Sequence, residues 1–155
     1  MLRTILIGVS AASAAGLLYV NLYNSIVDAP NWGAGIPESL MTARQYFTAA
    51  NPGNFFRVFS PLNQVLALIV VVLSWKTNRY LALASLAVAV LIDVFTFTYF
   101  YPRNAILFTG GLDAADLRAA WQEWSTMNWL RSAMCLVNAT LAFSLLVIAS
   151  KNSNK

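Results

Sequence analysis

The chain has no histidine, and Cys135 is the only cysteine among its 155 residues. The missing histidine removes the most common zinc and haem ligand, and the side chain that most often serves as a general base near neutral pH. One cysteine can form neither a disulfide within the chain nor a cysteine-based metal cage. We therefore expect no bound metal ion and no other cofactor.

Charged residues are also scarce. They make up 10% of the chain, compared with about 25% in a typical soluble protein. Hydrophobic residues make up 59%, and the mean hydropathy is +0.61. The net charge is +4, but the lysines and arginines are scattered singly and form no basic stripe, so we expect no nucleic-acid partner. This composition indicates a protein that lies largely within a membrane.

Long apolar segments are what the sequence has in abundance. A helix needs roughly 20 mostly apolar residues to cross about 30 Å of hydrocarbon. Four segments meet this requirement, at about residues 5–23, 56–75, 80–101 and 128–149. They predict an all-α fold in which residues 1–155 form a single domain, a four-helix transmembrane bundle.

The first apolar segment allows two interpretations. It could be a cleaved signal peptide with Arg3 in its basic region and a small-residue cleavage site at residues 12–14. Apolar character resumes at once from Leu17, which favours a full membrane span. Gly8, Ala12 and Gly16 follow each other at four-residue spacing, which predicts close helix packing. That packing could be internal to the bundle, or it could form a homodimer or bind a partner membrane subunit.

The positions of the basic residues predict the orientation in the membrane. One side holds Arg3, the turn with Lys76 and Arg79, and the tail with Lys151 and Lys155, without any acid. Five arginines on the other side are diluted over long loops and mixed with acids. Because cytoplasmic loops carry an excess of lysine and arginine, we expect both termini to be cytoplasmic, in the plasma (inner) membrane.

Two long loops would then lie outside. In the first loop, residues 37–49 read as a short amphipathic helix with Leu40, Ala43 and Phe47 along one face. In the second loop, Asp113 could cap a helix that runs to about Glu123. We expect these short amphipathic helices to form a cap that lies on the outer membrane surface.

Asp93 is the most informative single residue, because it lies inside a predicted span. It precedes Tyr101 by eight residues, which places it about 12 Å below the outer end of its helix. A carboxylate at that depth needs a cationic partner or becomes neutral. Arg131, about one turn inside the fourth span, is the best partner. The two could form a pair that fixes helix register, or Asp93 could be a functional carboxylate that acts as a base, a proton relay or a substrate anchor.

Other polar residues gather at a similar depth, in the outer halves of the spans, whereas the inner halves are almost purely aliphatic. This distribution predicts a cavity that opens to the outer side, above a dry floor, and that takes a small lipophilic molecule or a lipid. Asp93 and Arg131 are the candidate catalytic residues. The candidate substrate-binding residues are Asn21, Asn63, Asn104, Trp124, Asn128 and Asn138.

Three segments of the chain together resemble a known family. They are residues 19–23 with the later Pro30, the stretch from Tyr101 to Asn104, and the opening of the fourth span from Trp124 to Arg131. This combination, which spans most of the chain, is similar to the anthrone-oxygenase-like family of small four-helix integral membrane proteins. Many members have a histidine in the stretch before the final helix, and Asn128 occupies that region here.

The resemblance implies an oxidoreductase that oxygenates a flat polyketide phenol without a cofactor. In such chemistry the deprotonated substrate itself passes an electron to oxygen, so the protein supplies a base, a stabilised anion and a dry pocket. Charge and depth, not a family motif, suggest Asp93 as the base. They suggest Arg131 with Asn128 or Asn104 as the group that holds the oxyanion.

Three classes of function follow. The first is a membrane protein that binds or transforms a small lipophilic molecule in its outer half, so whether it is an enzyme stays open. The alternative is a non-catalytic accessory or structural subunit of a larger membrane complex. A transporter or channel is least favoured, because the inner halves of the spans lack the polar residues that would line a pathway.

Overall fold

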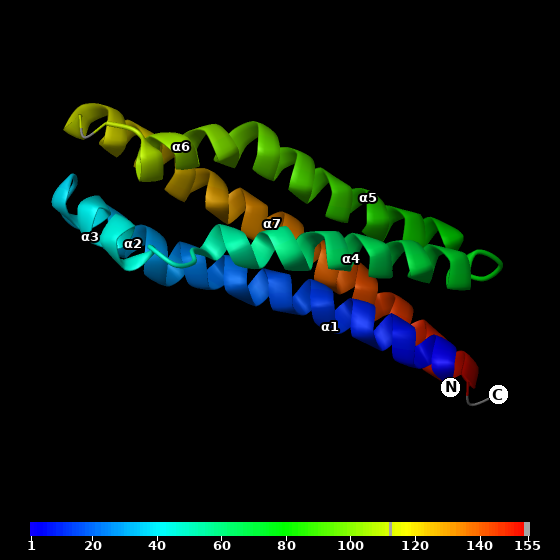
Figure 1. Ribbon diagram of the computed structural model, residues 1–155. Coiled ribbons are helices and arrows are strands. Elements are labelled where there is room, and N and C mark those ends of the chain that lie inside the picture. The colour runs from blue at the N-terminus through cyan, green and yellow to red at the C-terminus, as the bar shows by residue number, and fades with distance from the viewer. Residues whose placement is uncertain (112, 154–155) are drawn as a thin grey trace.

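Four long helices run side by side in the computed structural model, which describes residues 1–111 and 113–153 (Figure 1). They are α1 (Leu2–Tyr23), α4 (Pro52–Ser74), α5 (Arg79–Phe95) and α7 (Ala114–Ser153). Successive long helices are antiparallel, so both termini lie at the same end of the bundle. Helices α1 and α5 each pack against both α4 and α7. The predicted all-α, four-helix bundle is confirmed.

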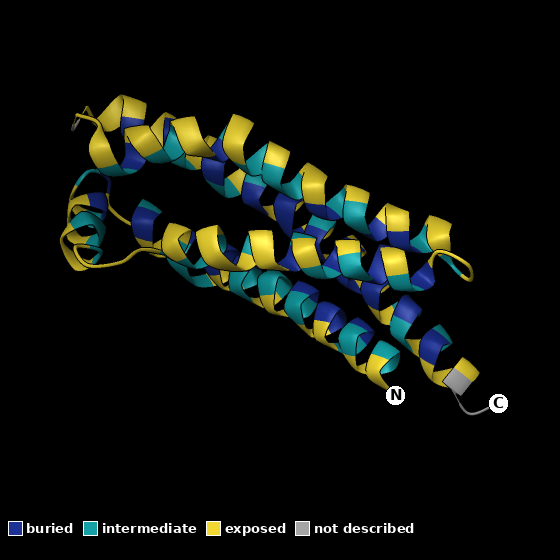
Figure 2. Ribbon diagram, turned by 45° about the vertical axis from the view of Figure 1, so that its right-hand side comes forward, coloured by how far each residue is buried: buried dark blue, intermediate teal, exposed yellow. Residues whose placement is uncertain are grey.

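Each of these helices is long and apolar enough to cross a membrane. The four candidate spans are Leu2–Gly33, Pro52–Ser74, Arg79–Thr109 and Ala114–Asn152. Buried residues line the interior of the bundle, and exposed residues cover its outward faces along the whole length (Figure 2). Many of these exposed residues are large and apolar, including Ile5, Leu68, Val72, Leu91 and Val137. An exposed apolar surface around a bundle of this length is that of an integral membrane protein.

The half of the bundle that holds both termini is here called the inner half, and the other the outer half. The inner half has an aliphatic core, in which Ile7, Val70 and Leu145 are buried together. Beside it, α1 and α7 approach each other through small residues on both helices: Ala11, Ala14, Ala139 and Ala142. This contact face differs from the predicted one. Of the predicted set, Gly8 faces Leu146, whereas Ala12 and Gly16 are exposed on the outward side of α1.

Three of the four helices continue beyond the predicted spans. A π-helical segment, η1 (Asn24–Asp28), joins α1 to α2 (Ala29–Gly33), and a second, η2 (Thr96–Phe100), joins α5 to α6 (Tyr101–Thr109). With 40 residues, α7 is about 60 Å long, roughly twice the hydrocarbon thickness. Helix α7 is therefore longer than a membrane span requires.

The outer end has a core of its own, here called the outer aromatic core. The short helix α3 (Glu38–Tyr46) packs there against the extended helices. Its buried members are Ala29, Trp32, Ile36, Leu40, Phe100, Leu107, Leu117, Ala120 and Trp124. The first predicted loop helix thus corresponds to α3, with Leu40 buried as expected. The outer segments pack against one another around this core.

The second predicted loop helix begins as expected. The Asp113 side chain accepts hydrogen bonds from the backbone N–H groups of Ala115 and Asp116, at 2.9 and 3.1 Å. The expected end near Glu123 is wrong, because the helix runs without a break into the fourth span as α7. No proline or glycine follows Glu123 within α7 to interrupt the helix.

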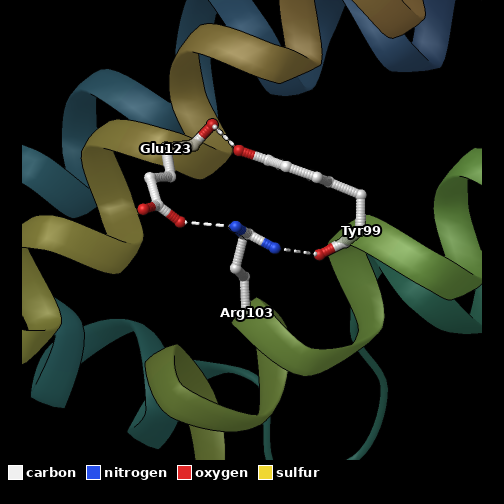
Figure 3. Close-up of polar contacts among 3 residues, drawn as sticks. All are labelled: Tyr99, Arg103 and Glu123. Carbon is white, nitrogen blue, oxygen red and sulfur yellow. Dashed lines mark hydrogen bonds and ion pairs between the residues drawn. The ribbon is translucent and has the colours of Figure 1, made fainter.

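Two arginines connect the outer segments through hydrogen bonds and an ion pair. Arg44 on α3 donates hydrogen bonds to the backbone carbonyls of Ile106, Leu107 and Gly110, which the end of α6 leaves without helical partners. Arg103 on α6 forms an ion pair with Glu123 on α7 at 2.6 Å. Its guanidinium also lies over the Tyr99 ring and donates to the Tyr99 carbonyl (Figure 3).

Candidate functional site

A small polar pocket lies at the centre of the bundle, between α1, α4, α5 and α7. Its volume is about 20 Å³, which is room for about one water molecule. The polar side chains that line it are Asn21, Ser60, Asn63, Asp93, Thr96, Arg131, Cys135 and Asn138. Arg131 precedes Lys151 by twenty residues of α7, so the pocket lies about 30 Å along the helix from Lys151.

Arg131 is the most unusual residue of the pocket. Only 5% of its surface is exposed, and its Nε is buried without a hydrogen-bond partner. Three aromatic rings surround the guanidinium, whose central carbon lies 4.1 Å from the ring centroid of Phe100, 5.2 Å from that of Phe56 and 5.9 Å from that of Trp124. The ring faces attract the cation but supply no acceptor atom to Nε.

Asp93 does not form the direct ion pair with Arg131 that would fix helix register. Within the part of the chain that the structure describes, the ion pair found is that of Arg103 with Glu123. The Asp93 carboxylate instead accepts a hydrogen bond from Nε2 of Gln64, which links α5 to α4. Ser60 also interacts with this carboxylate, and the charge of Arg131 acts on it from a greater distance. Asp93 is thus held by neutral donors of α4.

A buried network of amides and hydroxyls lies beside the pocket, where α1 passes into η1. Nδ2 of Asn21 donates to Oγ of Ser132 at 2.7 Å, and Nδ2 of Asn128 donates to Oγ of Ser25 at the same distance. Each asparagine also donates to the backbone carbonyl of the other. Both side-chain carbonyl oxygens are left buried without a donor. The network joins α1 to α7, and Asn21 extends it to the pocket.

The remaining candidate residues divide between the pocket and the outer aromatic core. Asn63 is buried and lines the pocket, as does Asn138, whose Oδ1 accepts a hydrogen bond from Ser85 at 3.0 Å. Asn104 lies outside the pocket, where its Oδ1 accepts the indole N–H of Trp124 at 2.8 Å. The Trp124 ring is nevertheless one of the three around Arg131.

Five of the eight candidate residues therefore meet in one pocket: Asn21, Asn63, Asp93, Arg131 and Asn138. Sequence reasoning did not select Gln64, which holds Asp93, nor Ser25 and Ser132, which complete the asparagine network. Gln64 directly follows Asn63 in an apolar segment, which is a usable signal. A serine within a helix carries no comparable signal, because serines often bond to their own backbone.

The site offers unpaired hydrogen-bonding atoms and no set of metal ligands among the described residues. Within the described residues, no group of three His, Cys, Asp or Glu side chains could hold a metal ion. Arg131 offers a donor that lacks an acceptor, and Asn21 offers an acceptor that lacks a donor. A bound hydroxyl group could satisfy both atoms, because it accepts from Arg131 and donates to Asn21, and Asp93 could accept its proton.

No protein-family model matches the chain. No curated protein and no solved structure matches it either. The resemblance to the anthrone-oxygenase-like family therefore stays a prediction that rests on the residues given above.

Proposed function

We propose that this integral membrane protein binds a small lipophilic molecule through the polar pocket in the outer half of its bundle. The observation that carries this proposal is the state of Arg131, a buried guanidinium with an unpaired Nε that faces no carboxylate at ion-pair distance among the described residues. Ionisable groups inside a membrane protein are costly and usually mark a site. An oxygen of a ligand would supply the missing acceptor.

The size of the pocket restricts how the ligand binds. At about 20 Å³, the pocket admits one polar group, whereas sites that enclose a whole drug-sized molecule measure several hundred Å³. The polar group of the ligand thus enters between Arg131 and Asn21. The apolar remainder lies between the helices or in the surrounding lipid.

Cofactor-free oxygenation is the finer form of this proposal, and the family resemblance is what suggests it. In this form Asp93 takes the proton of a phenol, and Arg131 stabilises the phenolate that then reacts with oxygen. The shared pocket of Asp93 and Arg131 supports this assignment, because base and anion-stabilising group must reach the same oxygen.

Native mass spectrometry of the protein, extracted gently from membranes, tests the proposal. We expect a bound small molecule on the wild-type chain that is lost in Arg131→Met, which keeps a side chain of similar length without the donor. Arg118→Met is the matched control, because Arg118 is exposed on the same helix. The same bound mass on all three proteins, or on none of them, would count against the proposal.

An accessory subunit of a larger membrane complex is the second candidate. It is favoured by the mutual bonding of Asp93 with Gln64, Asn104 with Trp124 and Asn138 with Ser85, because side chains that satisfy each other need no ligand. A partner chain retained in the same mass spectra, without any small molecule, would select this function.

A further inference from the structure

Helix α4 has buried residues only on the C-terminal side of Pro61. All of its buried residues follow Pro61: Asn63, Ala67, Val70, Val71 and Ser74. None of residues 52–62 is buried. The part of α4 after Pro61 is therefore anchored in the bundle by buried side chains, whereas residues 52–60 have none.

The outer aromatic core is assembled without α4. Its buried members come from α2, α3, η2, α6, α7 and the turn between α2 and α3. Of the described elements, only α1 and α5 make extensive contact with α4. A displacement of residues 52–60 would consequently leave the outer aromatic core intact.

Pro61 is placed where such a displacement could occur. It lies inside α4 and has no N–H to donate to the Arg57 carbonyl, so one hydrogen bond of the helix is missing at this point. Sharp bends in helices occur mostly at such prolines.

The outer part of α4 closes one wall of the polar pocket. Phe56 and Ser60 are its lining residues, and the Phe56 ring lies over Arg131. Val58 is exposed on the opposite face of the same turns, and Phe59 is exposed beside Phe56. The water-facing side of Arg131 is covered by Phe100 and Trp124, both buried.

We propose that residues 52–60 of α4 move about Pro61 and open the pocket sideways into the outer leaflet. The pocket then receives molecules dissolved in the bilayer, and not solutes from the water. That a ligand enters the pocket rests on the proposed function, whereas the opening movement does not depend on a ligand. It also explains how a pocket with room for one polar group can admit a larger molecule.

Cys135 allows the opening to be measured without knowledge of the ligand. It is the only cysteine, it is buried, and it lines the pocket. We would follow alkylation of the full-length protein in lipid nanodiscs by N-phenylmaleimide, which enters the bilayer, and by a sulfonated maleimide, which stays in water. We expect slow reaction with the first reagent and none with the second.

Two substitutions should change the rate in opposite directions. Phe56→Ala should accelerate reaction with N-phenylmaleimide about fivefold, because opening no longer breaks one contact with the guanidinium. Pro61→Ala should slow it roughly twofold or more, which is the order of effect of one added backbone hydrogen bond. Phe59→Ala, the same truncation on the exposed face, should leave the rate unchanged and serves as the control.

Equal rates for the two reagents in the wild-type protein would overturn the lateral route. Identical rates for the Phe56, Pro61 and Phe59 variants would overturn the movement about Pro61. A Phe56 variant that had lost its fold would react with both reagents, and the Pro61 variant would still report on the movement. If alkylation behaves as expected but no small molecule is found on the wild-type chain, the opening stands and the proposed function fails.

Discussion

The guanidinium carbon of Arg131 lies 4.1 Å from the centroid of the Phe100 ring, and the Phe100 side chain is completely enclosed. Phe100 is the last residue of η2 and belongs to the outer aromatic core. The packing of that core therefore sets the position of the buried charge. Asp93, which sequence reasoning suggested as its partner, is instead bonded to Gln64. Arg131 is positioned by rings and left with an unused donor, which is the basis of the first prediction.

Arg131→Met should leave the free energy of unfolding unchanged or raise it by up to about 1 kcal/mol. The reason is that an apolar side chain of similar length avoids the desolvation cost of a buried charge. The measurement is thermal unfolding in detergent, with Arg118→Met as the exposed control. A clear loss of stability confined to Arg131→Met would mean that the contacts with the aromatic rings hold the fold together. Arg131 would then be a structural residue.

Asn128→Ala should destabilise the protein by about 1–2 kcal/mol, because it removes the hydrogen bonds to Ser25 and to the Asn21 backbone inside the bundle. Unfolding by a denaturing detergent measures the change. Thr126→Ala, at an exposed position of the same helix, should have little effect. Equal stability of the two variants would show that the network contributes nothing to the association of α1 with α7.

Asp93→Asn should lower the turnover rate of a lipophilic phenol by about 100-fold or more, while the fold is retained. The asparagine keeps a side-chain oxygen that can accept the Gln64 hydrogen bond, but it cannot act as a base at neutral pH. Oxygen consumption measures turnover, and Asp116→Asn, exposed on α7, is the control. Retained turnover would exclude Asp93 as an essential base. A variant that fails to fold would show that Asp93 fixes the register of α4 and α5.

Arg44→Met should loosen the end of α6, because three backbone carbonyls lose their donor. We expect faster hydrogen exchange in α3 and at the end of α6, with a loss of about 1–3 kcal/mol in local stability. Arg57→Met, an exposed arginine on α4, is the matched control. Unchanged exchange at these positions would mean that the outer aromatic core holds α6 without Arg44.

The four spans could be predicted because long apolar runs have few alternatives in a membrane. The lengths of the helices could not, since prolines such as Pro30 and Pro102 usually interrupt a helix. In the structure each of these prolines lies in the first turn of a short helix, directly after a π-helical segment. A proline is tolerated at such a position, because its missing N–H is not required there. No sequence pattern identifies a π-helical turn, so the continuation of α1 into α2 and of α5 into α6 could not be predicted.

The polar residues of the site could be predicted from their depth, but their partners could not. Asp93 and Arg131, for which a similar depth was predicted, line the same pocket. Which donor reaches Asp93 depends on the rotation of α4, and hydropathy does not determine that rotation. The same holds for Asn104, which lies one turn too far out and bonds to Trp124.

Helix α7 runs without interruption from the outer aromatic core to the end of the bundle that holds both termini. It is about 60 Å long, and Arg131 lies near its middle. Because no break separates the two halves of α7, a displacement of the half in the outer aromatic core would also act on the Arg131 guanidinium. A protein that touched only the exterior part of α7 could alter the pocket without ever entering the bilayer.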